Sequence, residues 1–369
     1  MKRERIVFVD YLRAFACFLV MLVHASEGFY PTHYENGFFS TIATYENGFW
    51  ISFYDGFVGR ISVPLFMIVS AFLLVPLKPD TTMTGFYKHR FKRIIPPMVC
   101  FMILYCILPP LWGASTWEQA VQELMMIPFN FPSAGGHLWF MFPLISLYLI
   151  MPVISPWLEK ATAKEERLFI AFFILSTFVP WLVRFVSADL WGWCFWNPYF
   201  GMLYYCSGYI GYLVLAHYIR VHMTDWATSR RMKIGLLCFI IGGLFTALSF
   251  WIKIEPPKAV DSIALEWAFM FCSPNVLCAT FGMFLMFTCI KQAKAPKIIT
   301  EISKLSYGMY LMHMLFLSNI SSAIITSNPA TPIIPVWAAI PCIAILSYIC
   351  CFITSKIISL IPGSKWLIG

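Results

Sequence analysis

Three ionisable side chains, Asp10, Arg13 and His24, lie in the first apolar run of the chain, where such groups are costly and are candidates for function. At about 100° per helical residue, all three fall within a wedge of about 60° and form one polar stripe. Arg13 lies deep, and His24 lies about 16 Å away near the outer end. A neutral imidazole is the usual general base for a hydroxyl group. The stacked geometry suits a passage across the membrane, and a self-neutralising Asp10–Arg13 pair with an interfacial His is the structural alternative.

The composition predicts the kind of fold that holds this stripe. The 369 residues are 60% hydrophobic and 12% charged, against roughly 25% charged in ordinary soluble domains. Apolar runs of about 20 residues consume nearly all of the chain. We expect one membrane-embedded domain over residues 1–369, an all-α integral membrane protein with about ten transmembrane helices. The expected spans are 6–24, 52–77, 94–111, 137–155, 168–186, 199–217, 233–252, 264–290, 305–325 and 334–358.

The distribution of basic residues predicts the orientation. With the N-terminus inside, the 26 Lys and Arg fall in cytoplasmic segments, except for Arg13, Arg60, Arg184, Lys253 and Lys258. This asymmetry predicts that both termini are cytoplasmic and that the protein is a multi-pass component of the bacterial inner membrane. It also explains the net charge of +8 without a nucleic-acid partner. The twelve Cys show no metal-ligand spacing, so no metal site is expected.

Five segments, in order along the chain, resemble the acyltransferase 3 family of integral-membrane acyltransferases. The first is Asp10 and Arg13, followed after ten residues by His24. The others are residues 60–70 (RISVPLFMIVS), the basic turn at 86–96, residues 137–140 (HLWF) and residues 305–313 (LSYGMYLMH). Ala71 departs from the pattern, because many members carry Gly after the Ser.

The resemblance implies a membrane O-acyltransferase, of the form without an extracytoplasmic hydrolase-like domain. Its donor would be cytoplasmic acyl-CoA, acetyl-CoA being the commonest in the family, with no tightly bound cofactor. Its acceptor would be a hydroxyl on a cell-surface glycan or on a lipid-linked precursor, so polysaccharide modification is the expected role. Membrane lipid surrounds such a protein. Transfer would be completed within the membrane domain.

The first-helix residues take catalytic roles under this reading. His24, near the outer face, would deprotonate the acceptor hydroxyl, with a transient acyl-His as a variant. Arg13 would bind the donor or stabilise the thioester oxyanion, with Asp10 holding its orientation.

The phosphates of CoA need cytoplasmic cations, and the densest cluster is Lys88, Arg90, Lys92 and Arg93. The same cluster is also expected for topology alone.

The expected oxyanion and acceptor residues are Arg60, His137, Trp139, Tyr310 and His313. Arg60 enters the second span from outside as a further oxyanion donor, or it is an interfacial Arg. His137 and Trp139 open the fourth span and would order the acceptor, or they form part of an aromatic belt. Tyr310 and His313 share a helix face toward a partner helix, where structural hydrogen bonding is the alternative.

Two other functions fit parts of the pattern. A transporter or flippase for a glycan or lipid-linked precursor would explain the Pro-interrupted helices, but we find no matching interruptions in two halves of the chain. A binding or sensor module is the second alternative. Homo-oligomerisation stays open, because the small-residue seams at Gly242-Gly243 and at Gly208 and Gly211 can pack helices within one chain or between two.

Overall fold

The computed structural model describes residues 6–34, 37–127, 129–185, 201–325 and 332–369. Within these ranges, seven helical segments are long and apolar enough to cross a membrane. They are α1 (Val7–Glu27), Tyr45–Leu74, α4 (Met83–Leu111), Ser133–Lys160, α11 (Thr228–Trp251), α14 (Lys297–Ile325) and α15 (Val336–Ile358). The expectation of an all-α membrane protein is confirmed.

Three of the ten expected spans contain shorter helices. The described part of 168–186 contains most of α7 (Ala163–Thr177) and α8 (Val179–Phe185). The described part of 199–217 contains the 3₁₀ turn η3 (Tyr204–Cys206) and most of α10 (Ile210–Tyr218), which continues into the π turn η4 (Ile219–Met223). Within 264–290 the main helix is α13 (Pro274–Phe287). Pro has no N–H and fixes φ, so Pro180 and Pro274 suit the first turn of a helix. These prolines therefore shorten the helices that apolarity alone predicts to be continuous.

Two of the seven segments change helical type along their length. The second consists of α2 (Tyr45–Ile51), the π-helix η1 (Ser52–Gly59) and α3 (Ser62–Leu74). The fourth begins as the 3₁₀ helix η2 (Ser133–Phe140) and continues as α6 (Met141–Lys160). Two further short helices are α5 (Trp117–Met126), between α4 and η2, and α16 (Lys365–Ile368), at the C-terminus.

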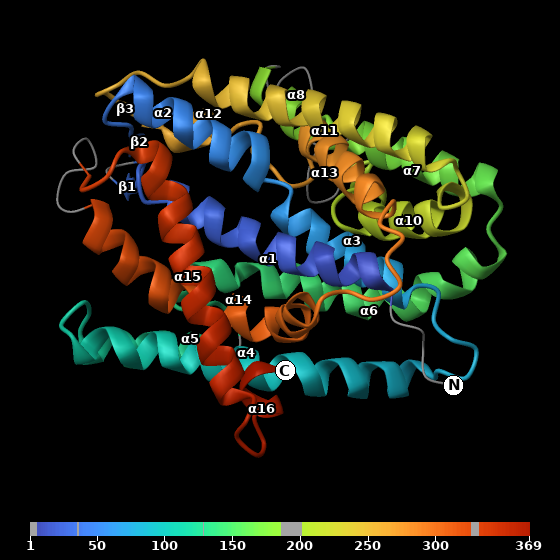
Figure 1. Cartoon of the computed structure of the whole chain (residues 1–369), viewed down its shortest axis with the longest axis horizontal. Coiled ribbons are helices and arrows are strands. Elements are labelled where there is room, and N and C mark those ends of the chain that lie inside the picture. The colour runs from blue at the N-terminus through green and yellow to red at the C-terminus, as the bar shows by residue number, and fades with distance from the viewer. Residues whose placement is uncertain (1–5, 35–36, 128, 186–200, 326–331) are drawn as a thin grey trace.

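A small antiparallel sheet joins two outer segments that are far apart in sequence. Its strands, in the order β1-β2-β3, are β1 (Thr32–Tyr34), β2 (Phe38–Thr41) and β3 (Ala259–Asp261). Asp261 then caps α12 (Ser262–Leu265) through its side chain. The sheet lies at the end of the molecule opposite to the start of α1 (Figure 1). The sequence predicted only outer loops here, because the pairing of short distant strands is not a local property.

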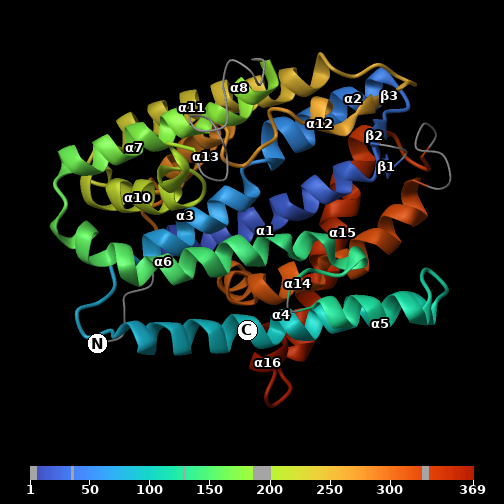
Figure 2. The same ribbon diagram turned by 180° about the vertical axis from the view of Figure 1, so that it is seen from behind.

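Helix α1 runs through the middle of the bundle, with α3, α14 and α15 packed around it (Figures 1 and 2). Its side chains Leu12, Leu19 and Met21 are fully buried. In the polar stripe of this helix, Asp10 is buried, and Arg13 and His24 are partly buried.

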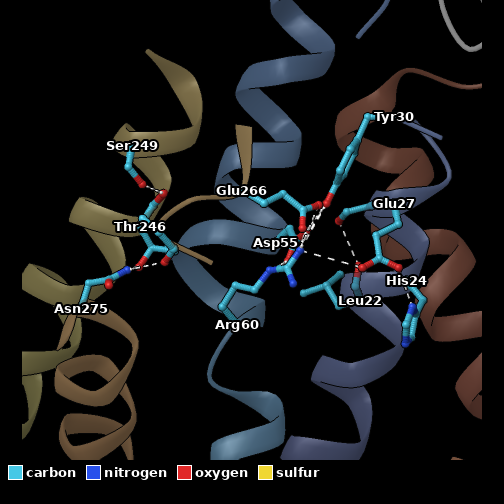
Figure 3. A network of polar contacts seen from close by, with 12 residues as sticks. Leu22, His24, Glu27, Tyr30, Asp55, Arg60, Thr246, Ser249, Glu266 and Asn275 are labelled. Carbon is cyan, nitrogen blue, oxygen red and sulfur yellow. Dashed lines mark hydrogen bonds and ion pairs between the residues drawn. The ribbon is translucent and has the colours of Figure 1, made fainter. Parts of the chain in front are cut away.

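Helices α11 and α13 approach each other closely where glycines of one helix face the backbone of the other. A Cβ on Gly242 would lie 2.3 Å from the Asn275 carbonyl oxygen, and one on Gly282 would lie 2.4 Å from the Gly235 carbonyl oxygen. The Asn275 amide also donates to Thr246 Oγ1 at 2.8 Å (Figure 3). The small residues of this seam therefore pack helices within one chain.

Candidate active site

His24 lies in the last turn of α1 and is paired with a carboxylate from the same helix face. Its Nδ1 is 2.6 Å from Oε2 of Glu27, at the i, i+3 spacing that makes neighbours on a helix. The carboxylate accepts the Nδ1 proton, so Nε2 of the neutral ring is left with its lone pair. This is the orienting arrangement of a general base. Glu27 was not among the residues predicted from the sequence, although its spacing from His24 was a usable signal.

An ion pair connects the His24–Glu27 pair to the second membrane segment. Arg60 binds both carboxylate oxygens of Asp55, with Nε 2.7 Å from Oδ1 and Nη2 2.7 Å from Oδ2. Arg60 Nη2 also lies 3.8 Å from Glu27 and 3.8 Å from Glu266 (Figure 3). Tyr30 donates its hydroxyl to Asp55 Oδ2 at 2.7 Å. The single guanidinium is therefore surrounded by three carboxyl groups, and Asp55 holds it in a bidentate geometry.

The π-helix of residues Ser52–Gly59 is what brings Asp55 and Arg60 together. In an α-helix, residues five apart would point about 140° away from each other. Here the Arg60 amide donates to the Asp55 carbonyl at 2.9 Å, the i to i+5 bond that defines the π turn. The wider turn places both side chains on one face. Sequence reasoning with α-helical geometry therefore missed Asp55.

Glu266 is partly buried, and this changes its acidity. This residue follows α12 and lies outside the seven membrane-crossing segments. Burial raises the pKa of the Glu266 carboxyl to about 7, against the opposing effect of Arg60. Glu266 therefore exchanges its proton near neutral pH, and the net charge around Arg60 changes with it.

Three histidines from three different elements lie close together, and one of them is His24 of the His24–Glu27 pair. His24 stacks on His313 of α14, with ring centroids 5.2 Å apart and planes at 30°. His137 of η2 lies edge-on to His313 at 4.5 Å and 6.4 Å from His24. Tyr310 donates its hydroxyl to the His137 carbonyl oxygen. The structure thus unites four of the residues predicted from the sequence.

Two of these imidazoles are anchored by backbone carbonyls. His313 Nδ1 is 2.6 Å from the Tyr310 carbonyl oxygen, and His137 Nε2 is 3.3 Å from the Leu311 carbonyl oxygen. The second ring nitrogen of each, His313 Nε2 and His137 Nδ1, is buried without a hydrogen-bond partner among the described residues. Within those residues, no cluster of three or more His, Cys, Asp or Glu is arranged to hold a metal ion.

A basic cavity opens at the N-terminal end of α1. It has two adjoining parts of about 130 and about 430 Å³, which share Arg13, Arg90 and Lys304 in their walls. Arg93 and Tyr310 line the narrower part. The cavity therefore leads from surface cations to the ring that contacts His137 and His313.

The structure separates the four predicted donor-binding cations into two pairs. Arg90 and Arg93 line the basic cavity. Lys88 is exposed and does not line it, and Lys92 lies over the ring of Trp366, 5.4 Å from its centroid. Lys304, which the sequence did not single out, takes a place in the wall.

Asp10 ties α1 to α14 at the same cavity. It accepts a hydrogen bond from Ser303 Oγ at 2.7 Å and lines the wider part together with Arg13. Both residues of the predicted pair therefore face the cavity.

A second cavity, of about 650 Å³, lies at the opposite end of α1. Arg60, Glu266 and Trp139 are among its lining residues. Trp139 stacks on Phe271, with ring centroids 5.4 Å apart. His137 and Trp139, two residues apart, therefore have different surroundings: His137 contacts the other histidines, and Trp139 lines this outer cavity.

Together these features define a helical membrane enzyme with a buried histidine site between two cavities, and comparison with known proteins agrees. The acyltransferase 3 family model, described as an acyltransferase domain, matches residues 6–356, and the chain belongs to this family. A relative from Bacillus subtilis (strain 168), named "Putative membrane-bound acyltransferase YfiQ", is 24% identical over 293 residues, which cover 74% of this chain and 72% of that protein. No solved structure matches the chain.

Proposed function

We propose that this acyltransferase moves an acyl group from cytoplasmic acyl-CoA to a hydroxyl of an extracytoplasmic glycan or of its lipid-linked precursor, in the bacterial inner membrane. One observation carries the proposal. A series of side-chain contacts runs from Tyr310 in the wall of the basic cavity through His313 to His24 and Glu27. Glu27 lies 3.8 Å from Arg60, which lines the outer cavity. Donor and acceptor would therefore approach His24 from opposite sides.

The basic cavity supports the donor half of the proposal. CoA carries several phosphate charges, and Arg90, Arg93 and Lys304 supply cations at the cytoplasmic end of the cavity. Arg13 lies deeper, where its fixed charge would polarise the thioester carbonyl. The narrow part of about 130 Å³ favours a short acyl group, and we propose acetyl.

The outer cavity supports the acceptor half. The Trp139–Phe271 pair offers an aromatic surface on which a sugar ring can stack. His24 Nε2 would take the proton of the sugar hydroxyl, and the Glu27 carboxylate would stabilise the imidazolium that forms. Arg60 would add positive charge for the developing oxyanion.

Calorimetric titration of the purified protein in nanodiscs with acetyl-CoA and CoA tests the donor half, with Arg13→Ala for comparison. We expect binding in the micromolar range that weakens in the variant, because a cation beside the thioester is lost. His24→Ala should keep donor binding and lose transfer, because the base is remote from the CoA phosphates. Folded protein that binds no acyl-CoA would refute the proposal, and vesicle assays of glycan movement would then test a flippase.

A further inference from the structure

We infer that His313 carries the acyl group covalently between donor and acceptor, so that transfer proceeds in two steps. This inference rests on the proposed function, because it needs an acyl-CoA donor on one side and a hydroxyl acceptor on the other. It assigns His24 to the second step alone. Three observations about His313 carry it: its tautomer, its unpartnered nitrogen and its position.

The tautomer of His313 is set by its own helix. Nδ1 lies 2.6 Å from the Tyr310 carbonyl oxygen, which can only accept a hydrogen bond. Nδ1 therefore carries the proton, and Nε2 presents its lone pair. A neutral imidazole nitrogen of this kind is a nucleophile as well as a base.

The free nitrogen of His313 is unusual for a structural histidine. The residue is fully buried, and Nε2 has no hydrogen-bond partner among the described side chains and backbone groups. Buried polar atoms are nearly always paired, and one that is not calls for an explanation such as a reactive role. A nucleophile must keep its lone pair free until the substrate arrives.

The position of His313 lies between the two halves of the site. On one side, its ring is 5.7 Å from the ring of Tyr310, which lines the basic cavity. On the other side, it stacks on the His24 ring at 5.2 Å. Tyr310 stands between the cavity and the imidazole, so the first step includes a displacement of this ring.

His137 is less suited to the same role. Its unpartnered atom is Nδ1, and its ring is 6.4 Å from His24, further than His313. It packs edge-on against His313 at 4.5 Å. We therefore assign His137 to positioning the His313 ring.

The two steps balance as follows. His313 Nε2 attacks the thioester carbonyl carbon, the C–S bond breaks, and CoA leaves as a thiolate while an acyl-imidazolium forms. His24 Nε2 then takes the proton of the acceptor hydroxyl, and the oxygen attacks the acyl carbon. The C–N bond breaks and its electron pair returns to His313. The proton on His24 is released and balances the thiolate, which leaves as CoA thiol.

Isotope exchange between labelled CoA and unlabelled acetyl-CoA tests this inference, because it needs an acyl-enzyme and no acceptor. We expect the full-length protein in nanodiscs to catalyse the exchange. His313→Asn, whose amide can still donate to the Tyr310 carbonyl, should lose exchange completely while it still binds acetyl-CoA by calorimetry. His24→Asn should retain exchange and lose transfer to the acceptor. His217→Asn, a buried histidine paired with Glu166 elsewhere in the fold, is the matched control for altered folding.

Each other outcome has a distinct meaning. Wild-type protein that binds acetyl-CoA and transfers its acetyl group but shows no exchange would refute the covalent acyl-enzyme. The proposed function would be unaffected. Exchange that survives in His313→Asn and disappears in His24→Asn would overturn the assignment to His313. Absence of acetyl-CoA binding in the folded wild-type protein would overturn the proposed function itself.

Discussion

At the scale of single residues, several carboxyl groups surround the guanidinium of Arg60. Asp55 holds Arg60 in two contacts of 2.7 Å, whereas Glu27 and Glu266 approach it only to 3.8 Å. Glu27 is thereby free to accept the proton of His24. Under the proposed function, the charge on Glu27 would act in catalysis, and the charge on Asp55 would position Arg60.

Glu27→Gln tests the first of these roles. The amide oxygen can still accept the Nδ1 proton, but it cannot stabilise an imidazolium by charge. We expect kcat of acyl transfer to fall by about 10²-fold or more, with little change in donor affinity. Steady-state transfer assays measure this, with the exposed Glu255→Gln as the control. Unaltered kcat in Glu27→Gln would show that the charge of Glu27 does not contribute to the reaction.

Glu266 makes the stability of the protein depend on pH. Its pKa is raised by burial from the ordinary 4.5 to about 7, so the folded state holds this proton more tightly than the unfolded state. The stabilisation of the folded state by protonated Glu266 is fully present below pH 4.5 and is lost as the pH rises through 7. Melting temperatures between pH 4 and 8 should fall more in the wild type than in Glu266→Gln. Parallel profiles of the two proteins would contradict the assignment.

At the scale of elements, the form of each helix decides which side chains meet. The π turn of Ser52–Gly59 puts Asp55 and Arg60 on one face. The 3₁₀ turn η2 directs His137 toward the histidines and Trp139 toward the outer cavity. Glycines let α11 and α13 approach closely behind the site. Irregular turns in two different helices therefore bring the residues of the candidate site together.

Gly282→Ala tests the packing of α11 on α13. Its new Cβ would lie 2.4 Å from the Gly235 carbonyl oxygen and 2.5 Å from the Phe239 amide nitrogen, and backbone cannot move aside cheaply. We expect a loss of about 1–3 kcal/mol in the free energy of unfolding, read as a lower melting temperature in detergent. Gly136→Ala, where no atom lies within 4 Å of the new Cβ, should melt like the wild type. Equal melting of both variants would contradict the packing.

At the scale of the whole molecule, two cavities at opposite ends of α1 differ in the charged residues of their walls. The basic cavity has Arg13, Arg90 and Lys304 in its walls. The outer cavity has Trp139, Arg60 and Glu266. This division suits a reaction whose donor and acceptor come from different sides of a membrane.

The double variant Arg90→Ala with Arg93→Ala tests the donor side. Hydrogen bonds to a charged partner contribute about 1.5–3 kcal/mol, so the Kd for acyl-CoA should rise at least about tenfold. Lys88→Ala with Lys92→Ala removes the same charge from neighbouring positions outside the cavity wall and should leave Kd nearly unaltered. Equal effects of the two pairs, measured by calorimetry, would reduce the cluster to a determinant of topology.

The sequence alone determined the membrane class, most of the long spans and the family. Apolar length and charge asymmetry are sums over neighbouring residues, so they can be read without a structure. The stripe of Asp10, Arg13 and His24 likewise follows from the regular period of one α-helix. The motifs around His137 and His313 pointed to further site residues, although not to their contact with each other.

Only the tertiary structure decided how the site is assembled. Glu27 and Asp55 became visible as site residues through their contacts with His24 and Arg60. Asp55 in particular depends on a π turn, which an α-helical period does not describe. The separation of Arg90 and Arg93 from their lysine neighbours depends on which faces of α4 the other helices cover. Contacts between helices and departures from the α-helical period are set by packing of distant segments, and local pattern carries no record of them.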